Sequence, residues 1–259
     1  FDVLQAIQRA RQGRPCDIHL LSNGMLLTSA TIDRLIDHGV TSLSISLDGG
    51  SAATNDTLRV GARFDTLWTH IADAVIRPEA RAADLRIGVS TVLTTHNRDE
   101  LPALAARLSA LGVDWFKVEE MCPTNLIAAQ SLIEPRDRRV APVLAQIYAA
   151  AGRMRIVDHL TPPPGCPCAS RPDDAAGRLR RQADDFANRA RFRSCRADWD
   201  QACIDPDGTV HPVDYMQPAI GNLARESLLS IWHGPAMQTR RAHAIAGLSP
   251  ALRESCPHT

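Results

Sequence analysis

Two short apolar segments of this chain are each followed at once by small polar residues. Ile18–Leu21 is followed by Ser22-Asn23-Gly24, and Leu43–Leu47 is followed by Asp48-Gly49-Gly50. Hydroxyl, amide and carboxylate groups at these positions could form hydrogen bonds with a bound small molecule. The same residues also have a purely structural explanation, because Asn and Gly tolerate positive φ in turns and Asp can cap a helix.

The segment between these two apolar runs predicts a helix. Ile32, Leu35 and Ile36 follow the i, i+3, i+4 spacing of one helix face within Thr31–His38, and Gly39 stands where helices commonly end. The unit is therefore strand, helix, strand, with its polar residues just past the carboxyl ends of the strands. That edge of a parallel α/β sheet or barrel is where ligands bind.

The alternation of strand and helix continues along the chain in repeats of about 30 residues, which favours parallel β/α units. Four such units are too few to close an eight-stranded barrel. We expect a polar loop over Asp56–Arg63, and Asn97 is available to cap a helix. The predicted helices are Phe64–Val75, Glu100–Leu111 and Arg136–Arg153, and the predicted strands are Arg86–Leu93, Asp114–Glu120 and Ile156–Leu160.

The C-terminal part of the chain has a different pattern. Thr161–Asp174 is rich in proline and predicts a loop or linker. Pro206-Asp207-Gly208 between two short apolar segments indicates a β-hairpin over 202–212, and Leu228–Trp232 and Met237–Ile245 predict short helices. We therefore expect three parts, which are a barrel domain over residues 1–160, a linker over 161–194 and a small α+β domain over 195–259.

The composition excludes several classes of function. The 29 Lys and Arg residues balance 29 Asp and Glu residues, so no net field favours nucleic acid or an anionic membrane. No apolar run approaches the length of a membrane span, and the first residues do not read as a signal peptide. The length fits one large α/β domain with a smaller appendage. We expect a cytoplasmic protein.

The seven cysteines gather toward the C-terminal half of the chain. In a chain of this size, such clustering favours metal binding or reduced thiols over a secreted disulfide framework. Cys166, Cys168, Cys203 and His258 could contribute to a Cys/His zinc site. The alternative is that the cysteines are buried apolar side chains.

Two sequence motifs resemble one known family. Leu21-Ser22-Asn23-Gly24 followed by Ser44-Ile45-Ser46-Leu47-Asp48-Gly49 resembles the third and fourth strands of the radical S-adenosylmethionine (SAM) barrel. The run from Cys195 through Ile204-Asp-Pro-Asp-Gly-Thr-Val-His-Pro and Ile220-Gly-Asn-Leu to Cys256 resembles the SPASM-type C-terminal extension. The resemblance covers most of the chain except roughly 122–190. It implies an α/β fold, a partial parallel (β/α) barrel of the radical SAM type with a small α+β SPASM-like extension.

The resemblance also implies roles for individual residues. Ser46 and Arg59 would hold the carboxylate of SAM, because a guanidinium binds a carboxylate bidentately and a strand-end hydroxyl adds a further donor. Asn23, Asp48 and Thr91 would also contact the cofactor, with Thr91 on the strand where relatives often place a ribose contact. The alternative for Arg59 is that it is one of many solvated arginines.

The catalytic 4Fe-4S cluster of the family needs three thiolates in a Cys-x3-Cys-x2-Cys loop. Cys16 is the only cysteine in the first 121 residues, so this loop is absent from the sequence given. The resemblance therefore implies cluster ligands upstream of Phe1, in a longer enzyme of which this chain is a crop. These 259 residues alone are not expected to cleave SAM. The alternative is a natural relative that has lost the chemistry.

The SPASM-like region keeps only part of the ligand pattern that usually holds auxiliary iron–sulfur clusters. The spacing from Cys195 to Gly208 fits, but Val213 stands at the next ligand position and Cys256-Pro-His-Thr replaces a Cys-x-x-Cys pair. His211 or Asp214 could replace a missing thiolate. The resemblance thus implies an incomplete auxiliary cluster site with Cys195, Cys256 and Cys203 as candidate metal ligands.

The function implied by the resemblance is that of a radical SAM oxidoreductase or maturase. A 5′-deoxyadenosyl radical would modify a peptide or a small biosynthetic substrate, with electrons from a reductant protein such as flavodoxin or ferredoxin. At most one of Glu119 and Glu120 would face this substrate, because adjacent side chains on a strand alternate. The alternatives are a non-catalytic peptide- or partner-binding remnant of the barrel, and a lyase or aldolase, for which Lys117 is the one strand-end lysine.

Overall fold

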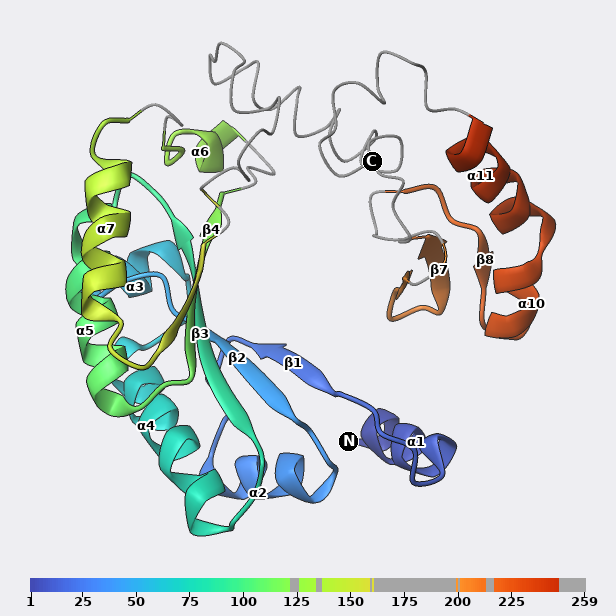
Figure 1. Cartoon of the computed structure of the whole chain (residues 1–259), viewed down its shortest axis with the longest axis horizontal. Coiled ribbons are helices and arrows are strands. Elements are labelled where there is room, and N and C mark those ends of the chain that lie inside the picture. The colour runs from blue at the N-terminus through green and yellow to red at the C-terminus, as the bar shows by residue number, and fades with distance from the viewer. Residues whose placement is uncertain are drawn as a thin grey trace. The chain divides into compact units, whose positions relative to one another are not determined.

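The computed structural model describes residues 1–121, 126–133, 137–158, 160, 199, 201–212 and 217–246. The chain forms two compact units, Phe1–Thr161 and Pro162–Thr259. Both units contain helices and strands (Figure 1). The predicted linker over 161–194 lies outside the described residues and stays a prediction.

The first unit is built on a five-stranded sheet in which all neighbouring strands are parallel. The strands lie in the order of the chain, β1-β2-β3-β4-β5. Because parallel crossovers share one handedness, a sequential order brings successive helices back to the same face of the sheet. The strands are β1 His19–Ser22, β2 Ser42–Ser46, β3 Arg86–Leu93, β4 Trp115–Glu120 and β5 Arg155–Asp158.

The helices of this unit lie mainly on one side of the sheet, where Figure 1 shows α3, α4, α5 and α7 beside the strands. This singly wound arrangement is that of a (β/α) barrel and differs from a doubly wound sheet, which is covered on both faces. The helices are α1 Asp2–Arg11, α2 Ser29–Asp37, α3 Ala52–Leu58, α4 Phe64–Ala80, α5 Leu101–Leu111, α6 Leu126–Ala129 and α7 Val140–Ala150, with a 3-10 turn η1 at Arg98–Glu100.

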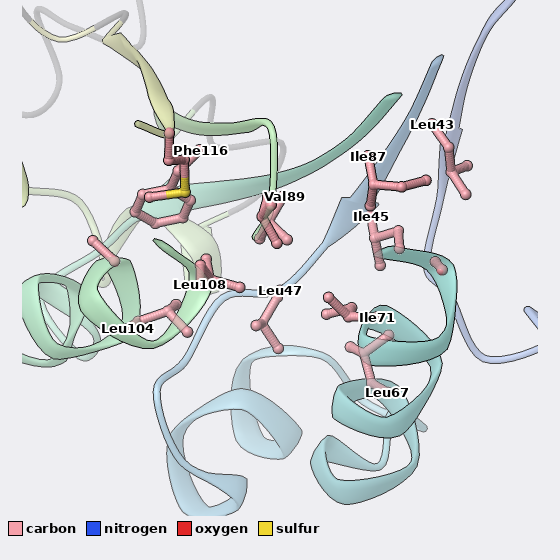
Figure 2. Close-up of a cluster of buried hydrophobic side chains, with 14 of the residues drawn as sticks. Leu43, Ile45, Leu47, Leu67, Ile71, Ile87, Val89, Leu104, Leu108 and Phe116 are labelled. Atoms are coloured by element: carbon pink, nitrogen blue, oxygen red, sulfur yellow. The ribbon is translucent and has the colours of Figure 1, made fainter. Parts of the chain in front are cut away.

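The main core lies between the sheet and these helices. Figure 2 shows Ile45 of β2 and Leu47, which directly follows β2, near Leu67 and Ile71 of α4. These four side chains and that of Leu43 are essentially inaccessible to solvent. Residues of β3, β4 and α5 extend the same cluster. Because side chains alternate along a strand, Ser42, Ser44 and Ser46 face the opposite side. We call it the helix-free face because, among the described residues of this unit, the helices of the core pack on the other side.

Several predicted element ends are confirmed, and each has a local cause. Helix α2 ends before Gly39 at φ +71°, as predicted. It starts at Ser29, two residues before the predicted start, because the Thr28 hydroxyl caps it by accepting a hydrogen bond from Thr31 N–H. Helix α5 ends at Gly112, also in the left-handed region at φ +93°. Strand β3 has the predicted bounds.

The helix predicted over 136–153 is Val140–Ala150, and the strand predicted over 156–160 is Arg155–Asp158. Three other predictions were also wrong in part. The expected loop over 56–63 begins inside helix α3, because Ser51 caps that helix by accepting from Thr54 N–H. Helix α4 continues past Val75 to Ala80 and includes Pro78 in its final turns. Asn97 does not cap α5, since its side chain donates to the backbone oxygens of Asp48, in the loop after β2, and of Val92 in β3.

The second unit contains a three-stranded antiparallel sheet of β6 Ala202–Ile204, β7 Thr209–Pro212 and β8 Gly221–Asn222. The predicted hairpin is confirmed, and its turn closes through Gly208 at φ +85°. Helices α10 Leu228–His233 and α11 Pro235–Ala246 follow. Ile231 of α10 packs so closely on Gly221 that a Cβ there would lie 2.6 Å from its side chain. Across the parts of both units that are described, every helix is too short or too polar to span a bilayer.

Candidate functional site

A cavity of about 380 Å³ opens beyond the carboxyl ends of β1 and β2. Three sequence-predicted residues, Asn23, Asp48 and Arg59, contribute to its wall. They come from the loop after β1, the loop after β2 and the segment that follows α3. The full lining is Asn23, Met25, Asp48, Leu58, Arg59, Val60, Gly61 and Ala62.

Arg59 and Asp48 form an ion pair at this cavity. Arg59 Nε lies 2.8 Å from Asp48 Oδ2, and Nε is buried. The N–H does not point along that line, so the contact is electrostatic and Nε has no well-aligned hydrogen bond. No described residue accepts a hydrogen bond from the rest of the guanidinium. The remaining N–H groups of Arg59 can therefore bind an anion at the cavity.

The Asp48 carboxylate is held by the neighbouring strand. Asp48 Oδ1 accepts a hydrogen bond of 2.8 Å from Val92 N–H and a longer contact of 3.4 Å from the Thr91 hydroxyl. Asp48 N–H donates to Asn55 Oδ1 at 3.0 Å. Asp48 therefore serves as a fixed support for Arg59.

Thr91 and Ser46 differ in their surroundings. Thr91 is fully buried, on the side of β3 that faces the helices, and its hydroxyl points to Asp48. Ser46 lies on the helix-free face, paired in register with Ser90, and no described residue shares a hydrogen bond with its hydroxyl. Ser46 can therefore bind a ligand directly, whereas Thr91 acts through Asp48. Their assignment as cofactor contacts stays a prediction.

Glu100 holds the loop after β2, and sequence analysis did not identify this role. Its carboxylate accepts hydrogen bonds from Gly50 N–H at 2.7 Å, from the Ser51 hydroxyl at 3.3 Å and from the Thr54 hydroxyl. Arg107 adds a bond to Gly50 O at 2.8 Å. Glu100 and Gly50 are far apart in the chain, so local pattern carries no signal for this contact.

The helix-free face carries further polar side chains in register with Ser46. The hydroxyl oxygens of Ser44 and Ser90 lie 2.6 Å apart, and Lys117 Nζ lies 2.5 Å from Glu119 Oε1. Glu119 shares this face, while Glu120 pairs in register with the buried Leu93 and is exposed. The two glutamates therefore point to opposite sides, as the alternation predicted.

The predicted metal ligands are only partly described. Cys195, Cys256, Cys166, Cys168, Val213, Asp214 and His258 lie outside the described residues. Cys203 is a half-buried free thiol on β6, opposite His211 on β7. His211 Nδ1 contacts Gln217 O at 2.6 Å and Nε2 contacts Asp205 Oδ2 at 3.1 Å. Both ring nitrogens are thus engaged by protein oxygens. Within the described ranges, no three His, Cys, Asp or Glu side chains are grouped to hold a metal ion.

Comparison with known proteins agrees with the two sequence motifs. Residues 195–258 match the family model of SPASM, an iron–sulfur cluster-binding domain. The chain is 23% identical over 214 residues to the AdoMet-dependent heme synthase of Methanosarcina barkeri (strain Fusaro / DSM 804). The aligned residues make up 82% of this chain and 59% of the synthase. The chain thus spans little more than half the length of this curated relative.

Two solved structures share the fold. SuiB of Streptococcus suis, bound to S-adenosylmethionine, superposes with a TM-score of 0.63 at 16% identity, covering 93% of this chain and 52% of that one. The structure of anSMEcpe with bound AdoMet and Kp18Cys peptide gives a TM-score of 0.53 at 13% identity, covering 93% and 64%. The expected partial (β/α) barrel is therefore confirmed.

Proposed function

We propose that this chain, a radical SAM family member with a SPASM domain, binds SAM at the carboxyl edge of β1 and β2 and presents a substrate on the helix-free face. The observation that carries the proposal is the Arg59–Asp48 pair. It fixes a guanidinium at a cavity and leaves most of its N–H groups without a described acceptor.

The residues at the cavity fit the amino-acid end of SAM. A carboxylate is the preferred partner of a guanidinium, which can bind both of its oxygens at once. The side-chain amide of Asn23 can both donate and accept. The Ser46 hydroxyl, which is not part of the cavity lining, offers a further donor at the end of β2. The cavity volume of about 380 Å³ lies within the range usual for small-molecule sites.

When bound, SAM and a 4Fe-4S cluster supply a 5′-deoxyadenosyl radical for hydrogen abstraction. The residues of this chain contribute binding and orientation. Arg59 neutralises the cofactor carboxylate, Asp48 and Glu100 hold the loops that carry the site, and Ser46 binds from the strand end. The Cys-x3-Cys-x2-Cys loop does not occur in these 259 residues, so they supply no ligand set for the catalytic cluster.

The match to SPASM supports an auxiliary iron–sulfur cluster in the second unit. Cys195, Cys256 and Cys203 are the proposed ligands, because thiolates are the groups that hold such clusters. His211 is a poor candidate ligand, since both of its ring nitrogens already contact protein oxygens.

The proposed substrate is a peptide, with a small biosynthetic molecule as the second candidate. The peptide-bound anSMEcpe structure supports the first, and the curated heme synthase supports the second. Electrons for SAM cleavage would come from a reductant protein such as flavodoxin or ferredoxin.

SAM affinity of the full-length protein tests the cofactor site. Arg59→Gln should weaken SAM binding about tenfold or more, because charge-assisted hydrogen bonds contribute roughly 1.5–3 kcal/mol each. Arg59→Lys should show a smaller loss, since it keeps the charge but not the planar fork. Arg63→Gln removes an exposed arginine four residues away and serves as the matched control. Equal affinities of the Arg59→Gln and Arg63→Gln proteins would contradict the proposed site.

Turnover needs a separate measurement on the full-length protein. After anaerobic reconstitution with iron and sulfide, we expect bound iron and formation of 5′-deoxyadenosine from SAM with dithionite, or with flavodoxin in its place. Absence of both iron and 5′-deoxyadenosine would leave the non-catalytic binding protein as the better description.

A further inference from the structure

Lys117 is the only lysine in the 259 residues, and every other one of the 29 Lys and Arg residues is arginine. It lies on β4 and pairs in register with Ser90, which pairs with Ser46. Since paired residues on adjacent strands share a face, Lys117, Ser90 and Ser46 form one row across the helix-free face. The one lysine ammonium group of this sequence therefore lies on the same face as the proposed cofactor contact.

The surroundings of Lys117 leave it able to bind an anion. Its ammonium group has three N–H donors, and Glu119 is its only partner among the described residues. The Lys117 side chain is 29% exposed, so it is sheltered yet accessible. Next to it, the Ser44 and Ser90 hydroxyls bind each other at 2.6 Å, which uses one of their two hydrogens and leaves the other to donate.

Two aromatic side chains, those of Trp115 and His19, lie on the helix-free face at the amino-terminal side of this row. The indole of Trp115 lies over Gly88, where an added Cβ would be 1.8 Å from Trp115 Cε2. The Trp115 ring centroid lies 6.1 Å from that of His19 on β1, so the indole extends across β3 toward the first strand. A ligand at Lys117 would therefore meet aromatic side chains toward the amino-terminal ends of the strands.

We propose that Lys117, with the Ser44–Ser90 hydroxyl pair, binds a carboxylate of the substrate and that Glu119 orients the ammonium group. The charge on Glu119 favours a monoanion over a dianionic phosphate, because like charges at short range repel. A compact ammonium suits this confined site better than the broad guanidinium that the chain uses elsewhere. The inference rests on the proposed function, since it takes the helix-free face as the substrate side.

The spacing is consistent with a substrate held beside the cofactor. Adjacent strands lie about 4.8 Å apart, so Ser46 and Lys117, two strands apart, are separated by about 10 Å at the backbone. The reacting part of a substrate can lie between these two anchors. Lys117 would then determine which substrates bind and in which orientation.

Nuclear magnetic resonance of the full-length protein with ¹⁵N-labelled lysine tests the subsite. The Lys117 ammonium signal is assigned by its loss in Lys117→Arg, at low temperature and mildly acidic pH, where ammonium protons exchange slowly. Arg14→Lys introduces a lysine at an exposed position and provides a reference signal in the same molecule, assigned by its absence from the unmodified protein. The first probe is sodium acetate, with sodium chloride at equal ionic strength as its control. The second is the capped peptide acetyl-Gly-Glu-Gly-amide, with the peptide that has Gln in place of Glu as its control.

We expect acetate to shift the Lys117 signal with saturation and to leave the reference signal of the Arg14→Lys protein unmoved. Ser90→Ala should weaken acetate binding about threefold or more, because a donor is lost, whereas Ser42→Ala should not. Tighter binding of the Glu peptide than of acetate would identify a peptide as the source of the carboxylate, and equal binding would identify a small molecule. Equal responses of Lys117 and the introduced reference lysine would overturn the proposal.

Titration of SAM into the same samples separates this inference from the proposed function. If SAM itself saturates the Lys117 signal and blocks acetate, Lys117 belongs to the cofactor site and the substrate subsite is overturned. If SAM fails to bind while acetate still shifts Lys117, the proposed cofactor function fails and the carboxylate subsite stands.

Discussion

The buried side-chain amide of Asn97 lies 2.7 Å from the backbone oxygen of Asp48 and 2.8 Å from that of Val92. One amide group therefore joins the loop after β2 to the end of β3. Its oxygen accepts from the backbone N–H and the hydroxyl of Thr94 at 2.8 and 3.1 Å. All hydrogen-bonding capacity of Asn97 is used to fix the segment that supports Arg59.

Asn97→Ala should lower the free energy of unfolding by about 3 kcal/mol, because several buried groups lose their partners. Asn23→Ala is the control, since Asn23 is exposed and makes one local hydrogen bond to Met25 N–H. It should cost less than about 1 kcal/mol. Chemical denaturation of both proteins measures the difference, and similar losses would show that the Asn97 contacts carry little energy.

Gly24→Ala should destabilise the protein more than Gly13→Ala. Both glycines have positive φ, +74° and +79°, so both substitutions incur the same backbone strain, about 1 kcal/mol. At Gly24 an added Cβ would also lie 2.3 Å from Leu67 and 2.8 Å from Ile45, whereas nothing lies within 4 Å of it at Gly13. We expect a further loss of about 2 kcal/mol at Gly24 from overpacking. Equal melting-temperature shifts would refute the close approach of α4 to this turn.

Gly88→Ala should cost about 3 kcal/mol because the new methyl group occupies the place of the Trp115 indole. In a Trp115→Leu background the same substitution should cost less than about 1 kcal/mol, since the obstruction is gone. A double-mutant cycle on the free energy of unfolding gives the coupling between the two positions. A cost that is the same in both backgrounds would show that Trp115 does not cover Gly88.

Asp137 should make stability depend on pH in the acid range. Hydrogen bonds from the Arg139 side chain and backbone lower the pKa of Asp137 from its usual 3.8 to about 2. Because the folded-state pKa is depressed, its stabilising contribution is complete above 3.8 and is lost as pH falls toward about 2. Asp137→Asn should remove this component of the urea-unfolding profile against pH, while Asp17→Asn, at an exposed position, should retain it. An unchanged profile in Asp137→Asn would contradict the assignment.

Much of the fold could be predicted because its causes are local in sequence. The period-two pattern of 86–93 and the helix spacing of Ile32, Leu35 and Ile36 each depend on neighbouring residues. So do the glycines at 39, 112 and 208, whose positive φ ends a helix or closes a turn. The error at α3 arose because its polar sequence resembles a loop, and the Ser51 cap that starts the helix was not taken into account.

The residues that line the candidate site could be predicted, but the residues that hold them in place could not. Asn23, Asp48 and Arg59 do line one cavity, since parallel strands bring their carboxyl ends to one edge. The roles of Glu100 and Asn97 depend on contacts across nearly fifty residues, which no local pattern encodes. The burial of Thr91 likewise depends on which face of β3 the helices cover, and alternation alone leaves that open.

The sequential strand order has a consequence for how the protein is made. From β1 onward, each strand pairs with the strand synthesised just before it, so every new unit can add to a surface that has already left the ribosome. Such pairing keeps the stretch of chain between paired strands as short as a parallel sheet allows, which lowers the entropic cost of forming each pair. The Asp48–Arg59 pair can form once β2 and α3 have emerged, but Asn97 and Glu100 can secure it only after β3 is complete. The proposed cofactor site would then mature in two stages during translation.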